Sequence, residues 1–430
     1  METATVKLWN KLVGAVLWNR NSRTATFEFD SSFINNKWDI APLTMSLEEV
    51  KRGNRIFEFK RLGKETFYGL PGLLSDVLPD KFGTALINAW LASQGRSSGS
   101  MNSVERLCYM GKRGMGALEF EPSLNKTKEA AVTLEIKSLV EMTQQILGER
   151  KQFSVNLNGD VKKGLENIIR VGTSAGGARA KAIIAYNEKT GVMRSGQVNA
   201  PKGYEHWLLK FDGVNNKQMG DTAGYGRIEL AYYHMALDCG IEMMESKLFE
   251  ENNHAHFMTK RFDRVKGQKL HVQSLCAMRH FDFSMVGSFA YEQAFETIRF
   301  LRLPASTSEQ FYRRMTFNVI ARNLDDHTKN IAFIMDKKGI WRLSPAFDVT
   351  YSYDPASVWV KQHNLSVNGK TIDIGKDDLL KVGKEMNVKY AKAIIEDIQR
   401  IVKKWPQYAK DVKVGDKQIK AINNTLLLNL

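Results

Sequence analysis

Apolar and polar residues near the start of the chain alternate with the period of two that is typical of strands. The segments Val6–Asn10 and Leu12–Trp18 predict a hairpin, and Thr26–Phe29 and Ile56–Phe59 continue the same pattern with aromatic residues on one face. The spacing changes at Phe82–Leu91, which predicts a helix. We therefore expect a β-rich first unit that passes into a helix.

The middle of the chain mixes both periods. Helical spacing recurs between Leu134 and Leu147, whereas Ala182–Tyr186 and Glu205–Phe211 predict strands. The apolar stripe from Ile228 to Cys239 predicts a helix that Gly240 ends. These elements predict a mixed α+β architecture.

The last third has mostly helical periodicity, interrupted by one hairpin. A helix is predicted at Phe311–Leu324, with Ser306 and Glu309 as its capping box. The apolar runs Ile331–Met335 and Ile340–Leu343, joined by a polar turn, predict the hairpin. Periodicity also predicts that Phe281–Leu303 and Gly375–Leu430 are mostly helical. The final apolar run, Leu426–Leu430, suggests a docked C-terminal helix.

Polar residues at the ends of these elements have the spacing that phosphoryl transfer requires. Asp325 opens the loop after the helix, Asn330 follows with the spacing Asp-x-x-x-x-Asn, and Asp348 comes after the hairpin. One carboxylate can orient an attacking hydroxyl while an amide oxygen and a second carboxylate hold Mg²⁺. The alternative is that these aspartates only end a helix and begin a turn.

A stretch rich in glycine and small residues precedes the strand at Ala182. It runs from Gly172 to Gly177, with Thr173, Ser174, Ala175 and Gly176 between them, and Lys181 follows. Glycines allow backbone amides to approach phosphate oxygens, which favours a nucleotide loop. The stretch matches neither G-x-G-x-x-G nor the Walker A motif, so an ordinary loop is the alternative.

Lys210 lies on a strand whose composition predicts burial. An unpaired buried ammonium is costly, and we expect ATP phosphates and Glu229, on the following helix, to compensate its charge. The alternative is an edge-strand lysine that extends its amine to water. His254 and His256 alternate on another strand, and without a third ligand they indicate surface residues more than a metal site.

Composition bounds the class of protein. A chain of 430 residues predicts two or three domains, and three dispersed cysteines suit a reducing compartment. No apolar run is long enough to span a bilayer and no targeting signal is evident, so we expect a cytoplasmic protein. The net charge of +15 and the pI near 9.5 favour polyanionic partners such as DNA, although a solvated basic surface gives the same numbers.

The segments Leu324–Asn330 and Arg342–Asp348 resemble the catalytic and metal-binding segments of the HipA family, the serine/threonine kinase toxins of bacterial toxin-antitoxin modules. The family form is D-G-H-A-K-N, so Asp326 and Thr328 depart from it at positions without assigned chemistry. The Leu-Pro-Asp segment near Leu78 resembles the N-terminal domain of the same family. The resemblance implies a two-lobed, protein-kinase-like (HipA-like) α+β fold with a β-rich accessory domain.

The resemblance also implies roles for individual residues. Asp325 would be the catalytic carboxylate, Asn330 and Asp348 the Mg²⁺ ligands, and Ser174 the site of self-phosphorylation. ATP would further contact the Gly172–Gly177 loop, Lys181, Lys210, Glu229, Lys260, Phe262 and His327. Lys260 replaces an acidic residue common in relatives, which leaves the role of that side chain open.

The domains expected on this basis are an accessory domain at 1–124, a kinase N-lobe at 125–260 and a helical C-lobe at 261–430. The implied partners are a small helix-turn-helix antitoxin, DNA through the antitoxin complex, and an aminoacyl-tRNA synthetase as protein substrate. Two other functions stay open from the residues alone: a basic co-repressor with a degenerate kinase site, and a kinase for a small molecule.

Overall fold

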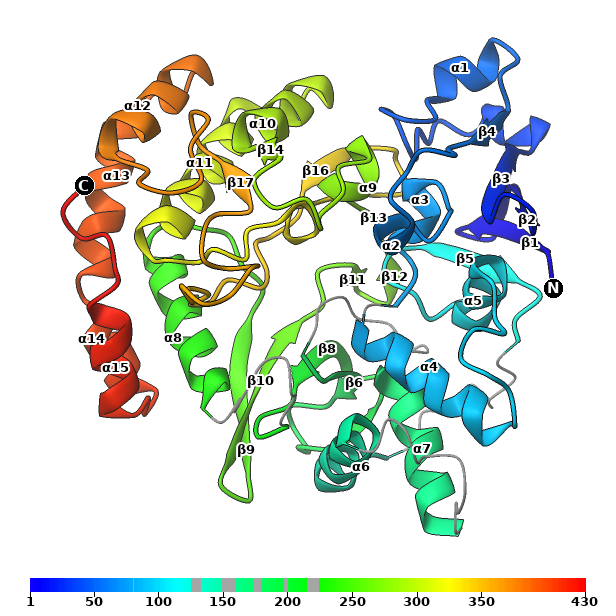
Figure 1. Cartoon of the computed structure of the whole chain (residues 1–430), viewed down its shortest axis with the longest axis horizontal. Coiled ribbons are helices and arrows are strands. Elements are labelled where there is room, and N and C mark those ends of the chain that lie inside the picture. Colours follow the sequence, from blue (N-terminus) through cyan, green and yellow to red (C-terminus); the bar gives the residue numbers. More distant parts are fainter. Residues whose placement is uncertain (80, 125–132, 149–158, 173–178, 197–199, 215–223) are drawn as a thin grey trace. The chain divides into compact units, whose positions relative to one another are not determined.

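The computed structural model describes residues 1–79, 81–124, 133–148, 159–172, 179–196, 200–214 and 224–430 (Figure 1). The chain divides into two compact units, each built from more than one stretch. Unit 1 comprises Met1–Ala223, Phe249–Gln273 and Met335–Gly339, and unit 2 comprises Gly224–Leu248, Ser274–Ile334 and Ile340–Leu430. The expected domain boundaries at residues 124 and 260 stay a prediction.

Unit 1 begins with an antiparallel five-stranded sheet in the order β4-β3-β2-β1-β5. Its strands are β1 (Thr3–Leu8), β2 (Lys11–Asn19), β3 (Thr24–Phe29), β4 (Ile56–Glu58) and β5 (Leu118–Glu121). The predicted hairpin is therefore present as β1 and β2. Short helices accompany the sheet: α1 (Leu47–Lys51), α2 (Lys64–Phe67), α3 (Gly72–Ser75), α5 (Ser103–Met110) and the 3₁₀ helix η1 (Ser31–Asn35).

A second five-stranded sheet in unit 1 has the order β7-β6-β8-β10-β9. Its strands are β6 (Lys181–Tyr186), β7 (Met193–Ser195), β8 (Glu205–Lys210), β9 (Ser246–Glu251), which begins in unit 2, and β10 (His254–Lys260). Three helices, α4 (Lys81–Ser93), α6 (Ile136–Gly148) and α7 (Gly159–Gly172), pack on one another, and α7 also packs on β6. The core between them includes Leu86, Leu139, Ile168, Ile184 and Leu209, all at most 2% exposed.

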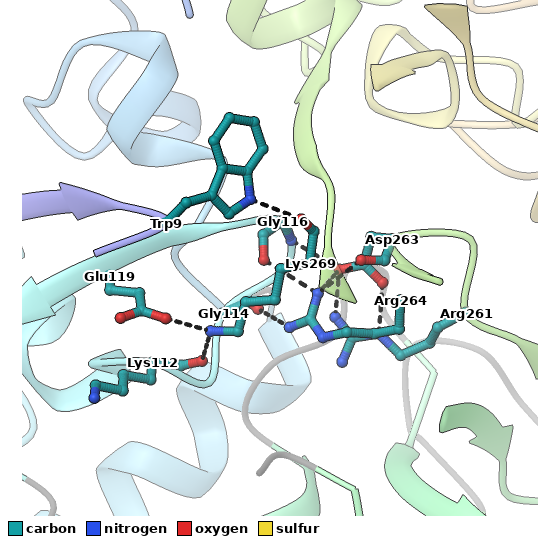
Figure 2. A network of polar contacts seen from close by, with 9 residues as sticks. All are labelled: Trp9, Lys112, Gly114, Gly116, Glu119, Arg261, Asp263, Arg264 and Lys269. Atoms are coloured by element: carbon teal, nitrogen blue, oxygen red, sulfur yellow. Dashed lines mark hydrogen bonds and ion pairs between the residues drawn. The ribbon is translucent and has the colours of Figure 1, made fainter. Parts of the chain in front are cut away.

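A polar network within unit 1 joins the first sheet to the chain that follows β10 (Figure 2). This chain forms β11 (Arg264–Val265), β12 (Gln268–Lys269) and β13 (His271–Ser274). The Asp263 carboxylate is fully buried and accepts hydrogen bonds from Arg261, Arg264 and the Gly116 amide. Burial alone would raise the pKa of this carboxyl, but the two guanidiniums lower it below its usual range.

Unit 2 is mostly helical. Its helices are α8 (Tyr225–Asp238), α9 (Leu275–Arg279), α10 (Tyr291–Phe300), α11 (Ala305–Ile320), α12 (Lys376–Glu385), α13 (Ala391–Val402), α14 (Trp405–Asp411) and α15 (Asp416–Asn423). Helix α11 packs against α13, and α8 packs against α14 (Figure 1). The shorter elements are β14 (Phe289–Ala290), η2 (Thr328–Asn330), β15 (Ala332–Met335), β16 (Trp341–Leu343) and β17 (Leu365–Ser366). Strands β15 and β16 pair, which confirms the predicted hairpin.

Three predictions for this region are wrong. Helix α11 begins after Pro304, without a side-chain cap, so Ser306 and Glu309 form no capping box, and Glu309 instead pairs with Arg313 at 3.0 Å. Residues 281–288 are turns rather than helix. The end of the chain at Leu426–Leu430 is not helical, and the Leu427 amide instead donates to the Ile320 carbonyl at 3.0 Å.

Among the described residues, none of the helices combines the length and apolar composition needed to cross a bilayer.

Candidate functional site

A pocket in unit 2 brings together the three residues that sequence spacing singled out for phosphoryl transfer. Asp325, Asn330 and Asp348 all contribute to its lining. Residues from α10, α11 and the segment after β16 complete the wall, among them Tyr291, Phe311, Arg314, Phe317, Asn318, Asn323 and Phe347. The expected proximity of these three polar side chains is therefore present within one unit.

The loop after α11 fixes the orientation of Asn330. Helix α11 ends at Ile320, and the chain then turns through Arg322, whose φ of 57° is left-handed, before reaching Asp325. The Asn330 Nδ2 atom donates to the Asp325 backbone carbonyl at 2.7 Å. Because a carbonyl only accepts, the amide nitrogen must face it, and the Asn330 amide oxygen is left to serve another partner.

Two backbone contacts place the segment that carries Asp348. Ala346 forms a parallel bridge with Met243, and Ser352 forms one with Asn323, immediately before the loop. Asp348 itself has a φ of 53°, in the left-handed region that aspartate tolerates better than most residues. The segment therefore runs beside the Asp325 loop and turns sharply at the aspartate.

Asp325 and Asp326 are neighbours with opposite environments. The Asp325 side chain is 47% exposed, and the nearest imidazole nitrogen, His327 Nε2, is 3.7 Å from its carboxylate. The Asp326 side chain is 1% exposed. Only the first can meet an incoming hydroxyl.

The buried Asp326 carboxylate is fully engaged. It accepts from the Tyr291 hydroxyl, contacts His363 Nδ1 and accepts from the Asn364 amide, each at 2.7 Å. Burial, together with this carboxylate, raises the pKa of the Tyr291 hydroxyl well above its ordinary value, so the tyrosine stays a donor. The residue that departs from the family glycine therefore has a structural task.

Sequence reasoning missed three polar residues of the pocket. Asn323 Nδ2 donates to Asn318 Oδ1 at 2.9 Å, and Asn318 Nδ2 donates to the Tyr291 hydroxyl at 2.9 Å. Arg314 donates to the Ser344 carbonyl at 2.8 Å, and burial lowers the pKa of its guanidinium to about 10, so it stays charged at neutral pH. A signal was available, because Arg314 and Asn318 are spaced i, i+4 on α11 and interrupt its apolar stripe.

Unit 1 carries a separate pair of predicted residues on one face of its second sheet. Lys181 on β6 is the direct cross-strand partner of Lys210 on β8, and both are buried, at 2% and 9% exposure. Residues directly opposite each other in an antiparallel pair have side chains on the same face, where like charges repel. Phe257 on β10 is the next partner across the sheet, and the Lys210 ammonium lies 5.7 Å from its ring. A bound anion on this face would lower the repulsion between the two lysines.

Comparison with known protein families places both parts of the chain. A model described as the HipA-like C-terminal domain matches residues 173–405, which is more than half of the chain. The HipA N-terminal domain model matches residues 4–121. The chain belongs to the HipA family.

A solved HipA structure shows the fold. The HipA chain in the complex of the Shewanella oneidensis MR-1 toxin-antitoxin system HipA, HipB and its operator DNA matches with a TM-score of 0.66 and 16% identity. The match covers 98% of this chain and 94% of that one, which confirms the expected HipA-like α+β fold. The Helicobacter pylori proinflammatory kinase CtkA aligns at a TM-score of 0.35 and 13% identity, over 52% of this chain and 88% of that one. A search of curated proteins by sequence gave no match.

The Gly172–Gly177 stretch, also expected to bind ATP in this HipA-family chain, is only partly within the described residues. Gly172 is the last residue of α7 rather than part of a loop, and a Cβ there would come within 2.5 Å of Leu86, so packing requires its small size. Thr173, Ser174, Ala175, Gly176 and Gly177 lie outside the described residues. Their role stays a prediction.

Lys260 and Phe262, which were also expected to contact ATP, lie at and just after the end of β10 in unit 1. The Lys260 ammonium pairs with Glu205 at 2.7 Å and lies 5.6 Å from the Trp207 ring. Phe262 is buried, at 7% exposure. Glu229, on α8 of unit 2, is 2% exposed, whereas Lys210 belongs to unit 1, so their pairing stays a prediction.

The donor atoms of the unit 2 pocket fit a magnesium ion. Mg²⁺ prefers oxygen ligands, binds proteins through one or two carboxylates and keeps water or phosphate oxygens in its other positions. The Asp348 carboxylate and the outward-facing Asn330 amide oxygen meet that requirement. Over the described parts of the chain, no three His, Cys, Asp or Glu residues gather into a metal-binding group, so His254 and His256 form no such centre.

Proposed function

We propose that this HipA-family chain is a Mg²⁺-dependent serine/threonine protein kinase that transfers the γ-phosphate of ATP to a protein hydroxyl. The observation that supports it is the pocket of unit 2, where Asp325, Asn330 and Asp348 are brought together and Asn330 presents its amide oxygen. Loop aspartate, loop asparagine and a later aspartate are the groups that kinases use for the acceptor hydroxyl and the metal.

Each residue has a distinct role. Asp325 accepts a hydrogen bond from the acceptor hydroxyl and orients it for attack, which its half-exposed side chain allows. Asn330 and Asp348 hold Mg²⁺, which supplies positive charge to the transferring phosphoryl group. Lys181 and Lys210 on unit 1 bind phosphate oxygens of ATP, because they place two positive charges on one face of the sheet.

The proposal includes partners and self-modification. The similar HipA was solved with HipB and its operator DNA, which supports a small helix-turn-helix antitoxin and its DNA as partners here. The family resemblance supports an aminoacyl-tRNA synthetase as acceptor. Ser174 is the proposed site of self-phosphorylation, where about −1.5 to −2 charges would repel ATP phosphates and switch the enzyme off.

Labelled ATP tests the activity directly. The protein is incubated with [γ-³²P]ATP, with and without Mg²⁺ and with and without a bacterial extract, and labelled proteins are then separated and mapped by mass spectrometry. We expect Mg²⁺-dependent label on Ser174 and on one defined protein of the extract. Absence of label from every protein, with correctly folded enzyme, would contradict the proposal.

The basic charge supports a second candidate, a co-repressor that binds DNA with its antitoxin while its kinase site is inactive. The net charge of +15 is the observation that favours it. It predicts DNA affinity that falls steeply with salt and no ATP turnover under any condition. ADP formation with transfer to a protein would exclude it.

A further inference from the structure

Large apolar side chains stand out on the surface of unit 2 close to the Asp325 loop in structure. Met285, Val358, Trp359 and Ile372 are 52%, 67%, 44% and 58% exposed, respectively. None of the four lines the pocket that contains Asp325. Single exposed apolar residues are ordinary on protein surfaces, but several on connected segments indicate an interaction site. We call these four residues the docking surface.

Hydrogen bonds around Asn364 connect the segments that carry the docking surface. The Asn364 carbonyl accepts from the Gly287 amide at 2.9 Å, two residues after Met285. Its Nδ2 atom donates to the Trp359 carbonyl at 3.1 Å. The His363 amide donates to the Thr371 carbonyl at 2.9 Å, which brings in the chain next to Ile372. The stretch around Met285 is thus held against the segment that contains Trp359 and Ile372, which lies far along the chain.

The same asparagine fastens the docking surface to the proposed catalytic loop. The Asn364 amide donates to Asp326 Oδ1 at 2.7 Å, and Asn364 Nδ2 also donates to the Leu324 carbonyl at 2.7 Å. Leu324 and Asp326 flank Asp325 in the chain. The segment that carries Trp359 is therefore tied by hydrogen bonds to the loop that contains Asp325.

We propose that the docking surface binds an apolar side chain of the phosphate-acceptor protein, next to the serine or threonine that receives the phosphate. This inference rests on the proposed function and names the acceptor class. A small-molecule acceptor would be enclosed by a pocket, whereas these side chains lie outside the pocket and project into solvent. Tryptophan is enriched among the residues that contribute most to binding at protein interfaces, because its side chain buries a large area.

A peptide library with a fixed central serine and one varied flanking position at a time provides the test. Phosphate transfer from labelled ATP is measured for the full-length protein and for two variants, Trp359→Ser and Val358→Ser. Phe300→Ser is the matched control, because Phe300 is also 55% exposed in unit 2 but lies on α10, outside the docking surface. ADP formation without peptide is measured in parallel.

We expect the wild-type protein to prefer peptides with a large apolar residue at one flanking position. In the Trp359→Ser variant, KM for the preferred peptide should rise about tenfold, and the preference should be lost, while ADP formation without peptide and the KM for ATP stay unchanged. The Phe300→Ser control should match the wild type.

Three results would overturn the docking surface. Unchanged preference in both variants would show that the acceptor does not touch it. Self-labelling without transfer to any peptide would also show that the surface does not bind an acceptor. A third such result is a pair of variants that change only the sedimentation of the protein, because the surface would then bind a second copy of the chain. No ADP or label from the wild type would instead remove the proposed function, and the docking surface with it.

Discussion

At the residue scale, two adjacent aspartates of one loop divide two tasks between them. Asp325 is half exposed, and the His327 Nε2 atom lies 3.7 Å from its carboxylate. Asp326 is buried and its carboxylate satisfies a tyrosine hydroxyl, a histidine and a backbone amide. The exposed carboxylate is available for chemistry because its neighbour fixes the loop.

This division predicts opposite effects on stability. Asp326→Ala would leave three buried polar groups without their acceptor and should lower the free energy of unfolding by about 3 kcal/mol. Asp325→Ala, the matched control one residue away, should change it by less than about 0.5 kcal/mol because its side chain is half exposed. Urea unfolding followed by circular dichroism measures both. Equal losses in the two variants would be inconsistent with this account.

Asp326 also shows what the sequence alone could not reveal. Its type suggested only the end of a helix or a turn, because its partners Tyr291, His363 and Asn364 are more than thirty positions away. Spacing within a loop was informative for Asp325 and Asn330, whose relation is local. Long-range hydrogen bonds to a buried carboxylate leave no local pattern.

At the element scale, periodicity predicted many strands and helices but not how they pair. The strand at Ala182–Tyr186 and the strand that carries Lys210 were both expected, whereas the register that sets Lys181 directly opposite Lys210 follows only from the sheet. Residues 281–288 lie in a stretch expected to be mostly helical, but they form turns that lead into β14, which pairs with β17 far along the chain. Register and pairing are tertiary properties.

The lysine pair predicts how ATP affinity responds to substitution. Lys210→Met should weaken ATP binding at least tenfold, because it removes one of two buried cations that an anion would contact. Lys189→Met provides a control, since this lysine lies in an exposed turn between β6 and β7. Isothermal titration with a non-hydrolysable ATP analogue measures the difference. Equal affinities for the two variants would count against the phosphate role of Lys210.

We expect the buried His271, which lies after β12, to make the stability of unit 1 depend on pH. His271 on β13 contacts the Ile40 carbonyl through Nε2 at 3.1 Å, and burial lowers its pKa from 6.5 to about 4. As pH falls, the imidazole of the unfolded chain takes up a proton before the buried imidazole of the folded chain does. The contribution of neutral His271 to the free energy of unfolding is therefore complete above about pH 6.5 and is lost as pH falls toward 4.

His271→Gln should therefore have a shallower decline of unfolding free energy between pH 6.5 and 4, by an amount on the order of 3 kcal/mol over the whole range. The exposed His234→Gln variant should keep the wild-type slope. Denaturant titrations at several pH values give these slopes. A His271→Gln slope equal to that of wild type would show that the buried imidazole does not control the effect.

At the scale of the whole molecule, the HipA fold is retained at 16% identity across 98% of the chain. The residues proposed for the chemistry lie in both units: buried lysines on a sheet of unit 1, and carboxylates with an asparagine in the pocket of unit 2. The family could be recognised from short motifs because the groups that phosphoryl transfer needs are few and locally spaced. The docking surface could not be recognised from motifs, since the hydrogen bond between Gly287 and Asn364 joins segments far apart in sequence.

The most direct test of the central claim is the rate of phosphate transfer from [γ-³²P]ATP by the Asp325→Ala variant, with ATP binding measured on the same sample. If Asp325 orients the acceptor hydroxyl, transfer should fall by about 10² to 10⁴-fold while Mg²⁺-dependent ATP binding and the unfolding midpoint stay close to wild type. Transfer at the wild-type rate would contradict the account.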